Sequence, residues 1–211
     1  MKRLEQIKEK ITLLKSLDSR YSIFGASKHR YKFNPVLEKS KIQAFEQKFN
    51  ISLPEEYKQF LTQIGDGGMG PGALGLEAFA NALSDDLDSL DDVKLNPALP
   101  FLHTEAWNLD FENIDNLEDD EYEEEREKLD EIYFDSKHVN GLMRISNYGC
   151  GIYFNIVVNG LEFGNIWVDD RCSDHGIYPY ENTSKTGRFS FFDWYEEWLD
   201  VSILQLNTQS I

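Results

Sequence analysis

The sequence predicts a single α+β domain in which helices pack on one β-sheet. Three observations along the 211 residues lead to this prediction. Apolar residues in the first third recur at helical spacing, residues 141–180 are rich in β-branched and aromatic side chains, and an aromatic helical pattern closes the chain. Helices, then a run of strands, then a final helix are typical of α+β folds.

A helix is expected within residues 1–20, ahead of a main domain that we place at residues 21–205. Its apolar residues recur at three- and four-residue steps, and therefore share one helix face: Leu4, Ile7, Ile11, Leu14 and Leu17. Such a face either packs on the helix's own domain, which is the commoner arrangement, or docks on a partner protein.

A second helix is expected from about residue 38 to residue 49. Ile42, Phe45 and Phe49 would face inward, and Asn50 is a plausible helix stop. A third helix should follow Ser52, because Ser52 and Glu55 form an S-x-x-E capping box and Pro54 lies in the first turn.

Glycines crowd the stretch IGDGGMGPGALGL at residues 64–76, and three of them have G-x-G-x-x-G spacing. A dinucleotide site needs a strand before such glycines and a helix after them. Here they follow the predicted third helix, and no G-K-[ST] of a P-loop is present. We therefore interpret Gly65 as the left-handed cap of that helix and the other glycines as a tight passage toward the sheet.

The negative charge of the protein is concentrated in one segment, which we interpret as an acidic insertion. Residues 81–140 hold 20 Asp and Glu against 4 Lys and Arg, a net of −16 out of −17 for the whole chain. A helix is expected within NLEDDEYEEEREKLDEIYF, with Tyr122, Leu129 and Tyr133 on one face and Glu124 paired with Lys128. Such charge disfavours nucleic-acid binding and is compatible with a basic protein partner. The alternative is a solvated helix face.

Strand chemistry begins after Gly141. Asn159-Gly160 is a hairpin turn signal between two strands, and Gly149 and Gly151 indicate a tight strand entry or bulge. A turn and a further short strand should follow in DDRCSDHGIYPYEN. The last helix should begin after Ser190, which is a fair N-cap, and its apolar stripe consists of Phe191, Trp194, Tyr195, Trp198 and Leu199.

The sequence offers little chemistry for catalysis. A metal could use the donors Asp169, Asp170, Cys172, Asp174 and His175, but an acidic turn at a strand end is the commoner explanation of such a cluster. Cys150 lies between glycines as a small buried apolar residue would, and no partner histidine is identifiable. We therefore expect no enzyme activity, no cofactor and no bound metal.

The order of the motifs resembles that of the SUKH superfamily, in its Smi/Knr-type branch, across residues 30–200. The motifs are LPEEYKQFLTQIGDGGMGPGALGL, LPFLHTEAWNL, NYGCGIYFNIVVNGLEFGNIWVDDR, GIYPY and SFFDWYEEWL. The resemblance implies helices on a curved, mainly antiparallel sheet and a non-enzymatic function. Bacterial members are commonly immunity proteins that bind and neutralise a toxin domain. Matching positions are mostly explicable as fold determinants: Leu53, Pro54, Tyr57, Gly65, Gly67, Gly68, Trp167 and Trp194.

An immunity protein of this kind would meet a basic toxin, such as a nuclease, through acidic and aromatic surface. The expected contact set is Asp119, Asp120, Glu123, Glu124, Glu127, Asp169, Asp170 and Tyr178. Two other classes remain open, a scaffold or regulator in cell-envelope assembly or signalling, and a small-ligand or metal-binding protein. No apolar run of the roughly 18 residues that a membrane span needs is present, so we expect no membrane contact. Two cysteines are too few for a disulfide framework and do not form C-x-x-C, so we expect a cytoplasmic protein.

Overall fold

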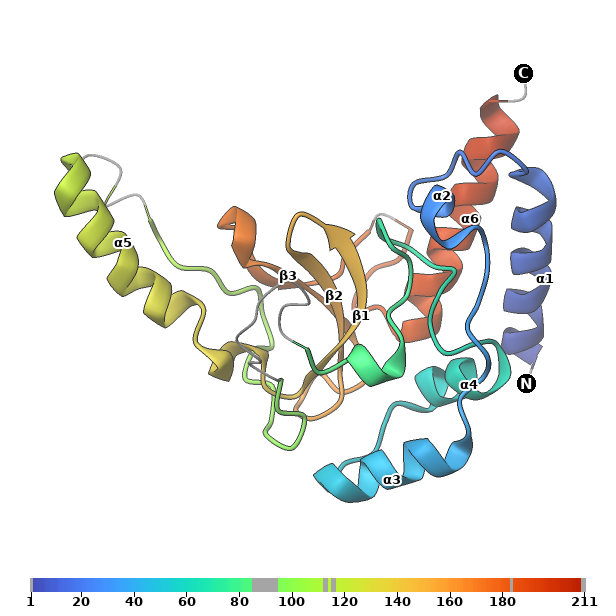
Figure 1. The fold of residues 1–211 in the computed structure, drawn as a ribbon, viewed down its shortest axis with the longest axis horizontal. Coiled ribbons are helices and arrows are strands. Elements are labelled where there is room, and N and C mark those ends of the chain that lie inside the picture. Colours follow the sequence, from blue (N-terminus) through green and yellow to red (C-terminus); the bar gives the residue numbers. More distant parts are fainter. Residues whose placement is uncertain (1, 85–94, 112–113, 115–116, 183, 210–211) are drawn as a thin grey trace.

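A computed structural model describes residues 2–84, 95–111, 114, 117–182 and 184–209 (Figure 1). The helices in this part of the chain are α1 (Lys2–Leu17), α2 (Ala26–His29), α3 (Lys39–Phe49), α4 (Glu55–Gln63), α5 (Asp119–Tyr133) and α6 (Phe191–Gln209). The strands are β1 (Leu142–Gly149), β2 (Ile152–Val157), β3 (Ile166–Asp170) and β4 (Gly176–Pro179). Short 3₁₀ turns lie at Phe79–Asn81, Ser136–Val139 and Arg171–Ser173.

The four strands form one open antiparallel sheet in the order β1-β2-β3-β4. Alternate residues point to opposite faces, as the two-residue period of a strand requires. Ile166 and Val168 join the large core under the helices, whereas Trp167 joins a smaller core beneath residues 95–107 and 133–139. The predicted α+β class and single domain are confirmed.

Helix α1 packs against α6, and the two helices lie side by side in Figure 1. Leu4, Ile7, Ile11 and Leu14 are buried, and each stabilises the fold by about 1.5–3 kcal/mol, whereas Leu17 is exposed. Arg3 adds ion pairs to Asp193 and Glu196 on α6 and to Glu56 on α4. The apolar face of α1 is therefore occupied by the protein's own core.

Helix α3 ends as predicted, because Asn50 caps it in the left-handed conformation. Ile42 is buried on its inner face, while Phe45 and Phe49 are partly buried. The capping box predicted for α4 is wrong. Pro54 occupies the N-cap position and no side chain caps the helix, while the nearby Leu53 amide donates to Glu46 Oε1 of α3 at 2.8 Å.

Gly65 follows α4 directly, but the prediction of a left-handed cap is also wrong. Its φ lies outside the left-handed region, and a Cβ at this position would lie 2.6 Å from Phe33 Cβ. The requirement for glycine is therefore close packing. The later glycines make the expected passage to the sheet, since Gly68 pairs with Leu76 and a Cβ on Gly72 would lie 2.5 Å from the Asn147 carbonyl oxygen.

The sheet has a tight turn at Gly149 and Gly151, where only a strand entry or bulge was predicted. Gly149, Cys150 and Gly151, all with positive φ, connect β1 to β2, and a register shift precedes them. The predicted hairpin at Asn159-Gly160 is confirmed, since this pair lies between the antiparallel strands β2 and β3, but the connection is longer than a two-residue turn: its turn residues are 161–164, and Gly160 pairs with Phe101. Cys150 is exposed at the tip of the first turn, so the prediction that it is buried is wrong.

Helix α6 begins with a reciprocal cap. The Asp193 amide donates to Ser190 Oγ at 3.3 Å, and the Ser190 amide donates to Asp193 Oδ2 at 3.1 Å. The predicted N-cap at Ser190 is confirmed. The predicted stripe packs in the main core, with Phe191, Trp194, Tyr195 and Leu199 buried and Trp198 partly buried.

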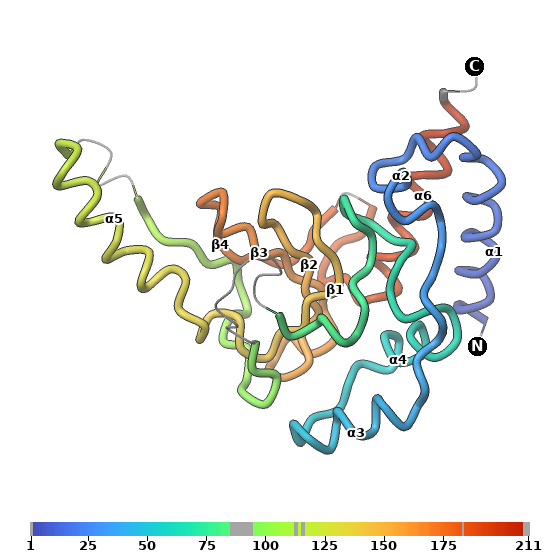
Figure 2. The backbone as a smooth tube through the Cα atoms, viewed as in Figure 1, coloured from blue at the N-terminus to red at the C-terminus, as the bar shows by residue number. Residues whose placement is uncertain are grey.

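Helix α5 extends away from the body, on the side of the sheet opposite α1 and α6 (Figure 2). Tyr133 is fully buried at its C-terminal end, whereas Leu129 is partly buried and Tyr122 is exposed. Lys128 makes an ion pair with Glu125 at 2.6 Å in place of the predicted pair with Glu124. The helix is thus attached at its C-terminal half, and its N-terminal half is a projecting arm.

Candidate protein-binding site

The projecting helix α5 carries an exposed surface of nearly uniform charge. Its 15 residues include nine Asp and Glu and two Lys and Arg, a net of −7. All five predicted contact residues on α5 are exposed: Asp119, Asp120, Glu123, Glu124 and Glu127. Three acidic residues in the first turn favour the helix by interacting with the positive end of its dipole.

Arg126 attaches the middle of α5 to the turn after β3. Its guanidinium donates two hydrogen bonds to the Asp174 carboxylate, at 2.8 and 3.0 Å, and a third to Asp130 at 2.8 Å. The hydrogen bonds from Arg126 hold the pKa of Asp174 below its usual range. The guanidinium also lies 4.4 Å from the ring centre of Phe111. A bidentate pair of this kind fixes the direction of the helix as well as its position.

A buried ion pair attaches the C-terminal end of α5. Asp169, at the end of β3, receives hydrogen bonds from Arg171 at 2.8 Å through both carboxylate oxygens. Arg171 in turn donates to the Tyr133 carbonyl at 3.0 Å. That carbonyl belongs to the last turn of α5, where a helix leaves acceptors unsatisfied and where its dipole favours a cation.

Asp170 also points into the protein. It is 6% exposed and lies 3.0 Å from His175 Nδ1, and the Tyr178 hydroxyl donates to it at 3.3 Å. Burial, together with the Asp170 carboxylate, raises the pKa of Tyr178 to about 12. The structure therefore divides the predicted contact set into five exposed acids on α5 and an internal cluster of Asp169, Asp170 and Tyr178.

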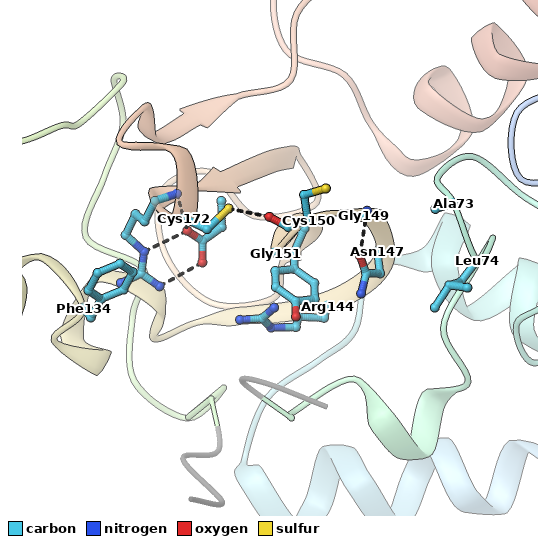
Figure 3. A pocket seen from close by; sticks show the side chains of 12 residues that line it. Ala73, Leu74, Phe134, Arg144, Asn147, Gly149, Cys150, Gly151 and Cys172 are labelled. Carbon is cyan, nitrogen blue, oxygen red and sulfur yellow. Dashed lines mark hydrogen bonds and ion pairs between the residues drawn. The ribbon is translucent and has the colours of Figure 1, made fainter. Parts of the chain in front are cut away.

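A cleft of about 590 Å³ opens between Phe134 just after α5, the sheet, the β1–β2 turn and residues 73–74 (Figure 3). Phe134 lies at one end, and Arg144 crosses the floor with its guanidinium 3.4 Å from the ring centre of Tyr153. Cys172 borders the cleft and donates to the Cys150 carbonyl at 2.9 Å. Burial raises the pKa of the Cys172 thiol, which lowers its thiolate fraction at neutral pH.

The metal alternative receives no support from the geometry. Among the residues that the structure describes, no group of three or more His, Cys, Asp and Glu side chains could hold a metal ion. Asp169 and Asp174 are engaged by arginines, as described above. Within the same described part of the chain, no helix has the length and apolar character needed to cross a membrane.

The residues that orient the arm were not singled out in the sequence. Arg126 and Lys128 are the two cations of α5, and a lone arginine in an acidic helix was a usable signal for an inward contact. Arg171 directly follows Asp169-Asp170, but its contact with Tyr133 spans 38 residues and has no local sequence pattern.

An open antiparallel sheet with helices on one side and an exposed acidic helix on the other defines an α+β domain with one strongly acidic arm. The chain belongs to the SMI1 / KNR4 family (SUKH-1), whose model matches residues 37–200. Domains of this family bind proteins and are generally non-catalytic. Neither the curated proteins nor the solved structures contain a match to this chain.

Proposed function

We propose that this protein is an immunity protein, which acts in the cytoplasm by binding a basic toxin domain and neutralising it. The proposal rests on helix α5, which projects from the body, has a net charge of −7 and exposes most of its carboxylates. Membership of a protein-binding family supports it.

Electrostatic complementarity explains how such an arm would act. A toxin that cleaves nucleic acid needs a basic cleft, and a rigid acidic helix can occupy that cleft in place of the phosphate backbone. The contacts of Arg126 and Arg171 hold the arm in one direction, which reduces the ordering cost of binding. The uneven charge of the chain would also accelerate the encounter at low salt.

The direct test is co-expression with each candidate toxin domain whose gene lies next to the gene of this chain. We expect the chain to restore growth and to co-purify with the toxin domain. If every adjacent candidate toxin fails in both assays, the immunity function is wrong, and a scaffold or regulator in the cell envelope or in signalling becomes the better explanation.

A charge-reversal pair separates the role of α5 from the effect of net charge. The test variant carries Glu123→Lys, Glu124→Lys and Glu127→Lys on α5, and the control carries Glu5→Lys, Glu9→Lys and Glu38→Lys, three exposed acids remote from α5. Both change the net charge equally. We expect the α5 variant to weaken toxin binding by about a hundredfold or more and the control to change it by less than about threefold. If the two variants weaken binding equally, α5 is not part of the toxin-binding surface.

A further inference from the structure

A second candidate binding surface lies on the other side of the molecule from α5. A groove of about 300 Å³ runs between α6, the loop before α2, the glycine-rich passage and the β1–β2 turn. Phe24, Tyr148 and Val201 form its rim and are 56%, 46% and 52% exposed. Large apolar side chains that gather around one groove at the surface are typical of an interaction site.

Six of the fourteen residues that line this groove are aromatic. Phe24 and Tyr148 pack together with ring centres 5.2 Å apart. Trp194, Trp198 and Tyr180 also line the groove. Ring faces of this kind attract cations, and tryptophan does so most strongly.

A buried carboxylate lies among these rings. Glu197 of α6 lines the groove and is 7% exposed, and its two oxygens accept hydrogen bonds from the Tyr180 hydroxyl at 2.9 Å and from the Ser184 hydroxyl. Among the ion pairs of the described residues, none involves Glu197. Burial and the hydrogen bond to Glu197 raise the pKa of Tyr180 to about 12.

Both donors to this carboxylate are neutral hydroxyls, one on each oxygen, so none of its hydrogen bonds brings a counter-charge. A buried charge is costly without a counter-charge, and a cation brought beside it gains both the ion pair and the aromatic faces. The exposed apolar rim favours a cation that is flanked by apolar groups, which a free metal ion or ammonium ion would not supply.

We propose that this groove binds an extended segment of a partner protein in which an arginine or lysine side chain lies between apolar residues. The cationic side chain enters toward Glu197, and its apolar neighbours cover Phe24, Tyr148 and Val201. The site is separate from α5 and does not depend on the immunity function, because it uses different residues on a different side of the fold.

The test uses the full chain and two capped peptides, Ac-Leu-Arg-Leu-NH₂ and its neutral match Ac-Leu-Gln-Leu-NH₂. Two of the four tryptophans line the groove, so tryptophan fluorescence reports its occupation. We expect saturable binding of the arginine peptide with a Kd on the order of millimolar and about tenfold weaker binding of the glutamine peptide. Glu197→Gln should abolish this preference.

Two further variants keep the test decisive if Glu197→Gln fails to fold. Phe24→Ala removes an exposed rim side chain and should weaken the binding of both peptides. The triple charge reversal on α5 should leave both affinities unchanged. Equal binding of the two peptides to the unmodified chain, or an unchanged preference in folded Glu197→Gln, would overturn the proposal. Weaker binding in the α5 variant would place the cation at α5 instead.

Discussion

Glycine is required in this chain for two different reasons. At some positions the backbone has a positive φ, and at others a neighbouring group leaves no room for a Cβ. Gly187 has a positive φ but open space around it, whereas Gly65 has an ordinary φ and Phe33 Cβ where its own Cβ would lie. The two glycines therefore resist substitution for different physical reasons, conformational strain at Gly187 and steric exclusion at Gly65.

A substitution series at Gly65 distinguishes these reasons. We expect Gly65→Ala and Gly65→Asn each to lower the free energy of unfolding by about 2 kcal/mol or more, because either Cβ would displace the side chain of Phe33. Gly187→Ala is the control and should cost about 1 kcal/mol, from strain alone. Urea unfolding measures all three. If Gly65→Asn is as stable as the unmodified chain, Gly65 is not limited by close packing, and the interpretation as a left-handed helix cap is supported instead.

His29 makes the stability of the fold dependent on pH. Burial lowers its pKa from 6.5 to about 4, and its Nδ1 accepts a hydrogen bond from the Tyr31 amide at 3.0 Å. Between these two pH values the unfolded chain binds a proton at His29 that the folded chain does not bind. Stability contributed by the neutral ring is therefore lost as the pH falls from about 6.5 toward about 4.

Acidification also reduces the repulsion within a chain of net charge −17, which changes its stability independently of His29. The effect of His29 is therefore measured as the difference in stability loss between the unmodified chain and His29→Gln. We expect the unmodified chain to lose at most about 2 kcal/mol more than His29→Gln between pH 7 and pH 5. Urea unfolding at both pH values gives the comparison. Parallel losses in the two proteins would mean that His29 is protonated in the folded state.

At the scale of elements, helix α5 is held by few contacts for its length. Its exposed half has no apolar face against the body, and its attachment depends on Tyr133, Arg126 and Arg171. In contrast, α1 and α6 share a continuous apolar contact. The acidic arm should therefore open locally at a lower free energy than the helices of the core.

Removal of the Arg126 anchor should loosen this arm selectively. We expect Arg126→Ala to speed amide hydrogen exchange in α5 by about tenfold, because the bidentate contact with Asp174 is lost. Exchange in β1–β3 and α6 should stay unchanged. Lys128→Ala is the matched control, since it removes a cation of α5 whose partner Glu125 lies on the same helix. Equal acceleration in both variants would show that Arg126 does not anchor the arm.

Local sequence patterns predicted the elements well and their junctions poorly. Neighbouring residues encode the features that were predicted correctly: the helical period of α1 and α6, the strand-rich segment after Gly141 and the cap at Ser190. The β1–β2 turn was missed because the sequence at Gly149 and Gly151 predicts only a strand entry or bulge, whereas Asn159-Gly160 correctly predicted the β2–β3 hairpin. The exposed acids of α5 were predicted from composition. The internal roles of Asp169 and Asp170 depend on contacts with Arg171 and Tyr178 that only the fold creates.

At the scale of the whole molecule, charge is separated from the main core. The acidic segment at residues 81–140 carries −16 and includes the projecting α5, whereas the remainder of the chain carries −1 and includes the packed helices α1, α4 and α6. Repulsion within one segment destabilises the folded arrangement of that segment, and dissolved ions reduce that repulsion.

Because the negative charge is concentrated in residues 81–140, the stability of the protein should depend on the salt concentration, mainly through repulsion at α5. We expect the Tm to rise by about 3 °C when NaCl is raised from about 0.05 M to about 1 M, because screening of about 1 kcal/mol of repulsion corresponds to a shift of that size. A variant with Asp119→Asn, Asp120→Asn, Glu123→Gln, Glu124→Gln and Glu127→Gln should have a higher Tm at low salt and a smaller rise. Calorimetry of both proteins across the salt range measures the two quantities. Because this charge-reduced variant experiences the same general salt effect on apolar burial, an identical rise in both proteins would show that repulsion at α5 does not limit the stability of the fold.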